Sequence, residues 1–138
     1  MSSFEKFSYS LVILERHLDS FGHVNNTKYL EIFEEARWNF ISEYGWGMEK
    51  IQKDQLGPVI LEAQVKFKKE LVLREKVHVI SQTQEIFHKI MVLNQSLYNE
   101  HDQLCCEAIF KVGLMDLKKR QLVEPSADWL RAIGVHSL

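Results

Sequence analysis

Residues 27–45 read TKYLEIFEEARWNFISEYG, and this stretch decides the fold. Apolar side chains recur in it at steps of three and four residues, as they do on one face of an α-helix. They are Tyr29, Phe33, Ala36, Phe40 and Tyr44, with Leu30, Ile32 and Ile41 widening the stripe. Asn25 and Asn26 suit the start of such a helix, and Gly45 suits its end. The sequence therefore predicts one long helix that is largely buried.

Strand patterns lie on both sides of this helix. Residues 7–15 alternate and predict a strand before it, because alternation places every second side chain on the same face. Four more strands are predicted after it, at 59–69, 72–86, 88–98 and 103–116, with short helices at 46–54 and 125–133. Short links between the last four strands favour an antiparallel meander. The order predicts the α+β class, in which a curved antiparallel five-stranded sheet wraps around one long central helix.

Composition excludes several functions. The chain has 138 residues, enough for a single domain over 1–138, and its formal net charge of −2 gives no basic excess for nucleic acid. No apolar run approaches the roughly 20 residues of a membrane span. Residues 1–6 lack the apolar stretch of a signal peptide, so we expect a cytoplasmic protein. The six histidines and the adjacent Cys105 and Cys106 show no metal-ligand spacing, and we expect no metal.

The loop before the helix, Asp19–Asn26, reads DSFGHVNN and holds the residues best suited to chemistry. Free N–H groups and the helix dipole at a helix start can polarise a carbonyl and stabilise an oxyanion. A carboxylate such as Asp19 can act nearby as a general base or as a nucleophile. Gly22 allows a sharp turn or the close approach of a ligand. The alternative is a capped loop in which Asp19 and His23 only form a turn.

The pattern D-x-x-G-H-V-N-N-x-x-Y-L-x-x-F-E-E-A-R, from Asp19 to Arg37, resembles the signature of the 4-hydroxybenzoyl-CoA thioesterase family of hotdog proteins. The resemblance implies a single hotdog domain that hydrolyses an acyl thioester, with CoA as part of the substrate and no other cofactor. It also implies a homodimer or homotetramer with sites at the subunit interface. An acyl-ACP thioesterase and a non-catalytic acyl-CoA or acyl-carrier binding module stay open. A hydratase is disfavoured, because its D-x-N-P-x-H pattern needs a histidine five residues after the aspartate, and His23 is four after Asp19.

The same resemblance assigns roles to residues. Asp19 matches the catalytic carboxylate, the backbone N–H of Asn26 matches the group that polarises the thioester carbonyl, and His23 matches a helper. His17 stands where the family has a first aspartate. Glu62 could supply a second carboxylate across a subunit boundary, or it could face solvent from its strand.

Substrate contacts are predicted more broadly. Gly22, Lys68, Lys69 and Arg74, or the cluster at 118–120, could contact the substrate and its CoA phosphates, although charge runs are commonly solvated. The acyl pocket is expected to use aromatic or apolar residues of the helix and of the segment after it: Phe33, Trp38 or Phe40, and Trp46 or Met48. Glu34, Glu35 and Arg37 are expected to form an exposed or subunit-facing polar edge. Glu70 replaces a family proline and is expected to affect only a turn.

Overall fold

The fold is known from a computed structural model, which describes the backbone of residues 3–137 and the side chains of residues 4–136. The helices are α1 (Asn26–Glu43), α2 (Met48–Asp54) and α3 (Ala127–Ala132), and a single 3₁₀ turn, η1, covers Glu15–His17. The long strands are β2 (Lys6–Val12), β3 (Leu56–Phe67), β4 (Lys76–Phe87), β5 (Ile90–Tyr98) and β6 (Leu104–Asp116). The short strands are β1 (Ser3–Phe4), β7 (Gln121–Val123) and β8 (Val135–Ser137).

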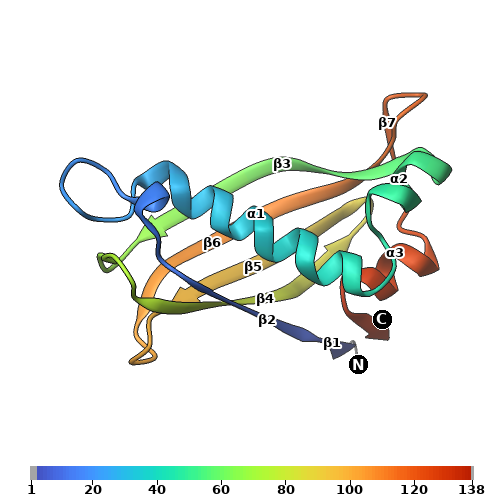
Figure 1. Ribbon diagram of the computed structural model, residues 1–138. Helices are drawn as coiled ribbons and strands as arrows, with labels where there is room; N and C mark the ends of the chain where they lie inside the picture. The colour runs from blue at the N-terminus through green and yellow to red at the C-terminus, as the bar shows by residue number, and fades with distance from the viewer. Residues whose placement is uncertain (1–2, 138) are drawn as a thin grey trace.

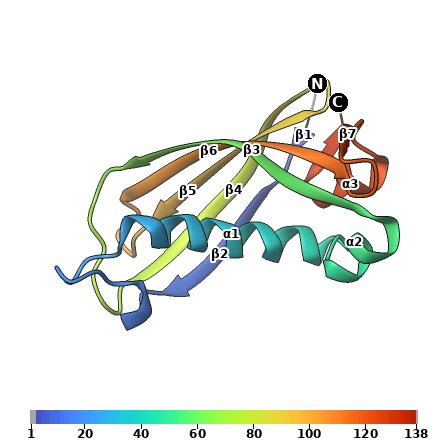
Figure 2. The ribbon, with the colours of Figure 1, turned by 90° about the horizontal axis from the view of Figure 1, so that it is seen from above.

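The five long strands form the predicted antiparallel sheet, in the order β2-β4-β5-β6-β3 (Figure 1). The short strand β7 pairs with β6, and β1 pairs with β8 in a separate small sheet near both chain ends. These three short strands were not predicted, because two or three residues carry no readable alternation. The sheet curves around α1, as the view from above shows (Figure 2). The α+β hotdog arrangement predicted from the sequence is confirmed.

The predicted meander of four strands was wrong for its first member. β4, β5 and β6 follow one another as expected, but β3 pairs with β6 instead of β4. The link at 68–75 has eight residues and spans up to about 26 Å when extended. Three strand spacings of about 4.8 Å separate β3 from β4, so the link is long enough to cross the sheet. β3 and β2 are therefore the two edges of the sheet.

Helix α1 buries one face only, although the sequence favoured a largely buried helix. Its core face consists of Tyr29, Ile32, Phe33, Ala36, Phe40 and Ile41, packed on the inner side of the sheet. The sheet covers one side of the helix, and nothing in residues 3–137 forms a second layer on the other side, so Leu30 is 43% exposed. Within residues 3–137, no helix is long and apolar enough to cross a membrane.

Two element boundaries differ from prediction for local reasons. The first strand ends at Val12, because η1 begins at Glu15. Residues 72–75 form a loop, since Arg74 has a φ of 68° and its N–H donates to the C=O of Ile13. The predicted hairpin turn at 99–102 is confirmed. The predicted domain, 1–138, includes residues 1, 2 and 138, which lie outside the described residues.

Candidate active site

His17 holds the base of the loop that leads into α1. Its ring is buried, and its Nδ1 accepts a hydrogen bond from the N–H of Leu14 at 2.8 Å. Its C=O accepts from the N–H of Asn25 at 2.9 Å, so one residue ties both ends of the loop together. Burial lowers the pKa of the His17 imidazole, which keeps Nδ1 free to accept. The histidine that replaces the family aspartate thus has a hydrogen-bonded, structural position.

One oxygen of the Asp19 carboxylate accepts hydrogen bonds within the loop, and the other oxygen does not. Oδ1 of Asp19 accepts from the backbone N–H of Phe21 at 2.8 Å and from that of His23 at 3.2 Å. The turn between them uses Gly22 at a φ of +85°, a conformation that glycine adopts without strain. In the described part of the chain, Oδ2 of Asp19 has no hydrogen-bond partner. The turn-forming role and a chemical role therefore fit the same side chain.

The start of α1 presents one free backbone donor. Asn25 is the N-cap, and its side-chain Oδ1 accepts from the N–H of Thr27 at 3.0 Å. The N–H of Lys28 donates to the C=O of Asn25 at 2.9 Å. Among the described residues, the N–H of Asn26 has no such partner. It lies at the positive end of the helix dipole, where it can donate to an oxygen that gains negative charge.

The crossing link between β3 and β4 forms the second wall of the site. The N–H of Val24 donates to the C=O of Leu71 at 3.0 Å and fastens the link to the loop. His23 Nε2 lies 3.2 Å from Glu70 Oε2. The expectation that Glu70 affects only a turn was therefore wrong. Sequence reasoning missed this contact because it exists only when the link crosses the sheet, and no local pattern reports that crossing.

The loop before α1, the start of α1 and the link after β3 line an open cleft of about 600 Å³. The cleft brings together the predicted residues Asp19, His23, Asn26, Lys68 and Lys69. Phe21, Val24 and Asn25 of the predicted loop also line it, whereas three further lining residues were not predicted: Tyr29, Phe67 and Glu70. Two of these aromatic rings are open to solvent, since Phe21 is 84% exposed and Phe67 is 55% exposed.

Four predicted contacts do not line this cleft within one chain, and the first is Gly22, which forms the turn of the Asp19 loop. Glu62 forms an ion pair with Lys111 of the neighbouring strand at 3.3 Å. Arg74 forms an ion pair with Glu15 at 2.8 Å. The cluster at 118–120 forms the β6–β7 turn, at the opposite end of the sheet from the start of α1 (Figure 1). No group of three or more His, Cys, Asp or Glu side chains in the described residues is arranged to hold a metal ion.

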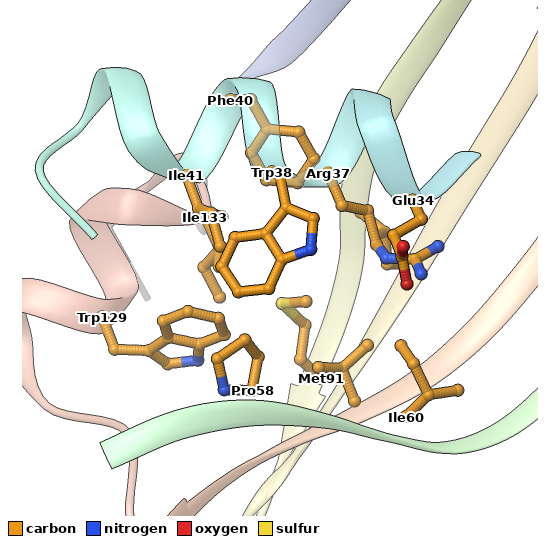
Figure 3. A pocket seen from close by; sticks show the side chains of 12 residues that line it. Glu34, Arg37, Trp38, Phe40, Ile41, Pro58, Ile60, Met91, Trp129 and Ile133 are labelled. Atoms are coloured by element: carbon orange, nitrogen blue, oxygen red, sulfur yellow. The ribbon is translucent and has the colours of Figure 1, made fainter. Parts of the chain in front are cut away.

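A second, smaller cavity of about 90 Å³ lies under the C-terminal half of α1 (Figure 3). Trp38 and Phe40 line it, as expected of an acyl pocket, but Phe33, Trp46 and Met48 do not. Arg37 also lines it and is half-buried, so of its two expected positions, exposed or subunit-facing, the exposed one was wrong. Its guanidinium donates to the buried Gln95 Oε1 at 3.0 Å and lies 4.5 Å from the centre of the Phe110 ring.

A sheet curved around one long helix is the arrangement found in hotdog-fold thioesterases of known structure. Residues 14–133 match the thioesterase-like superfamily, and the chain belongs to that family. The protein is a thioester hydrolase of this fold.

Individual relatives agree with this assignment. The chain is 29% identical over 106 residues to the long-chain acyl-CoA thioesterase FadM of Escherichia coli (strain K12), covering 76% of this chain and 80% of that protein. A Staphylococcus aureus protein solved in complex with CoA has a TM-score of 0.87 at 16% identity, over 94% of this chain and 82% of that one. A 1,4-dihydroxy-2-naphthoyl-CoA thioesterase from Synechocystis has a TM-score of 0.85 at 17% identity, over 94% and 96%. At these identities the two structures establish the fold alone.

Proposed function

We propose that this protein hydrolyses acyl-CoA thioesters in the cleft at the start of α1. One observation carries the proposal: the unpartnered carboxylate oxygen of Asp19 and the free N–H of Asn26 belong to residues that line the same cleft. A base or nucleophile and an oxyanion donor are the two groups that thioester hydrolysis requires. The similarity to FadM, which is named for acyl-CoA, and to a protein solved with CoA supports the choice of carrier.

In the proposed reaction the carbonyl oxygen of the thioester accepts a hydrogen bond from the backbone N–H of Asn26. This hydrogen bond stabilises the negative charge that develops on the oxygen. Asp19 takes a proton from water while the water oxygen bonds to the acyl carbon. The C–S bond then breaks, and the thiolate of CoA receives that proton to leave as the thiol. In the alternative route Asp19 attacks the carbon itself, the C–S bond breaks and the CoA thiolate leaves. Water then hydrolyses the mixed anhydride to the free acid and regenerates Asp19, and the proton released protonates the thiolate. His23, held by Glu70, is proposed to be a helper that positions the substrate or the water.

The variant Asp19→Asn tests the proposal cleanly. Its amide oxygen can still accept from the N–H groups of Phe21 and His23, so the loop is expected to keep its shape. We expect kcat to fall by at least about 100-fold, the scale of losing a general base. Asp54→Asn is the matched control, because Asp54 is exposed at the end of α2, at the opposite end of the molecule from the start of α1 (Figure 1). Near-normal turnover by folded Asp19→Asn would contradict the assignment.

CoA is proposed as the carrier, with Lys68 and Lys69 at the rim of the cleft as contacts for its phosphates. An acyl-ACP substrate would use the same cleft. Equal acyl groups on CoA and on ACP decide between them, through the ratio of kcat/KM. A protein that binds acyl-CoA without turnover would instead be a binding module. Cytoplasmic location stays a prediction of the sequence.

A homodimer is also proposed, or a tetramer built from such dimers. β3 is an edge strand of twelve residues with no partner on its outer side among the described residues. Long unpaired edges readily pair with another chain. Ile60 and Leu61 are 44% and 45% exposed on this strand, which favours its coverage by a second copy. Sedimentation equilibrium should give twice or four times the chain mass of 16.3 kDa, and a monomer would contradict this arrangement.

A further inference from the structure

The cavity under α1 has a polar opening and an apolar inner end. Glu34 is exposed and Ile60 is half-exposed at the opening, whereas Leu93, Trp129 and Ile133 are buried. Figure 3 shows Trp38, Met91 and Trp129 gathered at one side and Glu34 with Arg37 at the other. A chain that enters from the opening therefore passes the two charged residues before it reaches the apolar end.

Arg37 has hydrogen-bonding capacity that its own chain does not use. A guanidinium has five N–H donors, and one acceptor, Gln95 Oε1, takes a hydrogen bond from Nη1. Arg37 has no ion pair among the residues that the structure describes. Across residues 4–136 the one buried side-chain nitrogen or oxygen without a partner is Trp46 Nε1, so the other nitrogens of Arg37 reach open space. The cavity is the open space that Arg37 lines.

The pairing of Glu34 with Arg37 limits which chemical groups of a ligand can bind beside them. A carboxylate on the ligand would gain from Arg37 but would be repelled by Glu34. A hydroxyl group fits both, since its oxygen accepts from the guanidinium while its O–H donates to the carboxylate. The cavity, at about 90 Å³, is smaller than the roughly 150 Å³ that holds benzene in an engineered protein, which favours an aliphatic tail.

This cavity and the cleft of its own chain are separate pockets, because no residue lines both. Arg37 is eleven residues beyond Asn26, which is about 16 Å along a helix.

A second copy paired along β3 changes this relation. Antiparallel pairing centred between Leu61 and Glu62 sets Pro58 opposite Val65 of the other copy. Pro58 lines the cavity, and Val65 is two residues from Phe67, which lines the cleft. The cavity of each copy then adjoins the cleft of the other.

We infer that Glu34 and Arg37 of one copy are specificity-determining residues for the other copy's site, where they bind a hydroxyl group on an aliphatic acyl chain. The inference rests on the proposed function and on the proposed dimer. It goes beyond both, because it assigns a substrate class and two residues that act across the interface.

The first test compares 3-hydroxyoctanoyl-CoA with octanoyl-CoA, which differ by one oxygen. We expect kcat/KM to favour the hydroxylated substrate by about 10-fold or more, the factor of one hydrogen bond to a charged group. Glu34→Ala and Arg37→Met should each remove most of that preference. Glu35→Ala is the control, since Glu35 is adjacent but does not line the cavity. Glu34 is exposed, so Glu34→Ala is expected to fold and to test the inference even if Arg37→Met folds poorly.

Equal kcat/KM for the two substrates, or a preference that survives in Glu34→Ala, would overturn the inference. So would a stronger preference for 4-hydroxybenzoyl-CoA, because its ring does not fit an aliphatic subsite. The affinities of the Asp19→Asn variant for 3-hydroxyoctanoyl-CoA and octanoyl-CoA, measured by calorimetry, separate failure of the subsite from failure of the proposed function. Absent hydrolysis by the wild type refutes the function, whereas equal affinities refute the subsite.

Mixed dimers test whether the two residues act across the interface. Glu34→Ala chains are exchanged into dimers with a ten-fold excess of Asp19→Asn chains. Nearly every Glu34→Ala chain is then paired with an Asp19→Asn chain. The working site of such a dimer takes its Asp19 from the first chain. If the residues act in trans, Glu34 comes from the second chain and the hydroxyl preference returns. A preference as low as that of Glu34→Ala alone would show that they act within one chain and would overturn the inference.

Discussion

Gln95 joins the sheet to α1 beneath the cavity, and its replacement by methionine should cost about 3 kcal/mol of stability. The side chain is fully buried. Its Oε1 accepts from Arg37, and its Nε2 donates to the C=O of Phe33 and to Ser81 Oγ, each at 3.0 Å. A hydrogen bond to a charged group contributes roughly 1.5–3 kcal/mol and a neutral one roughly 0.5–1.5 kcal/mol. The lower part of the summed range applies, because the hydroxyl of Ser81 can rotate and Arg37 reaches open space.

The assay is urea unfolding followed by circular dichroism. With a slope of about 2 kcal/mol/M, a loss of about 3 kcal/mol lowers the midpoint by about 1.5 M. Gln121→Met is the control, since Gln121 is exposed on β7 and its replacement should stay within about 0.5 kcal/mol. In a double-mutant cycle, Gln95→Met should cost much less once Arg37→Met is present. A loss below about 1 kcal/mol, or simple additivity with Arg37→Met, would refute the argument.

Two further predictions concern the cleft. Lys68→Ala combined with Lys69→Ala should raise KM for acyl-CoA and leave KM for acyl-pantetheine unchanged, because pantetheine lacks the nucleotide phosphates. Lys118→Ala is the remote control. Equal effects on both substrates would contradict phosphate contact. His17 has its pKa lowered by burial from the ordinary 6.5, so the stability that it contributes is present above pH 6.5 and is lost as pH falls through the lowered pKa. Melting temperatures from pH 8 to pH 5 should therefore show His17→Gln converging on the wild type at low pH. A difference between the two proteins that stays constant over this range would contradict the role.

The helix and the loop before it could be predicted because their signals are local. The cap at Asn25, the turn at Gly22 and the apolar spacing after them all lie within about one helix length of chain. Each signal reports the conformation of its own neighbourhood, so a single sequence suffices. The same locality explains why the sequence alone assigns Asp19 and Asn26 to one site. Their roles stay predictions until the variants are measured.

The sequence left Arg37 either exposed or facing another subunit, and the exposed alternative was wrong. A charged residue on a helix is usually exposed. Arg37 is four residues from both Phe33 and Ile41, which lie on the buried face. Helical spacing therefore places Arg37 on the buried side of α1. What the spacing does not reveal is why the burial is tolerated, because Gln95 and Phe110 come from strands more than fifty residues away.

The pairing of β3 could not be predicted, and it is the feature on which the site arrangement depends. A meander and a crossing link fit the same strand lengths, because strand alternation reports which face a residue occupies and not which strand lies beside it. The crossing sets Glu70 against His23 at one end of the molecule. It also leaves β3 on the edge, with the cleft near Phe67 and the cavity near Pro58. An antiparallel partner on that edge necessarily exchanges the two ends, so a second copy would bring each cavity beside the other's cleft.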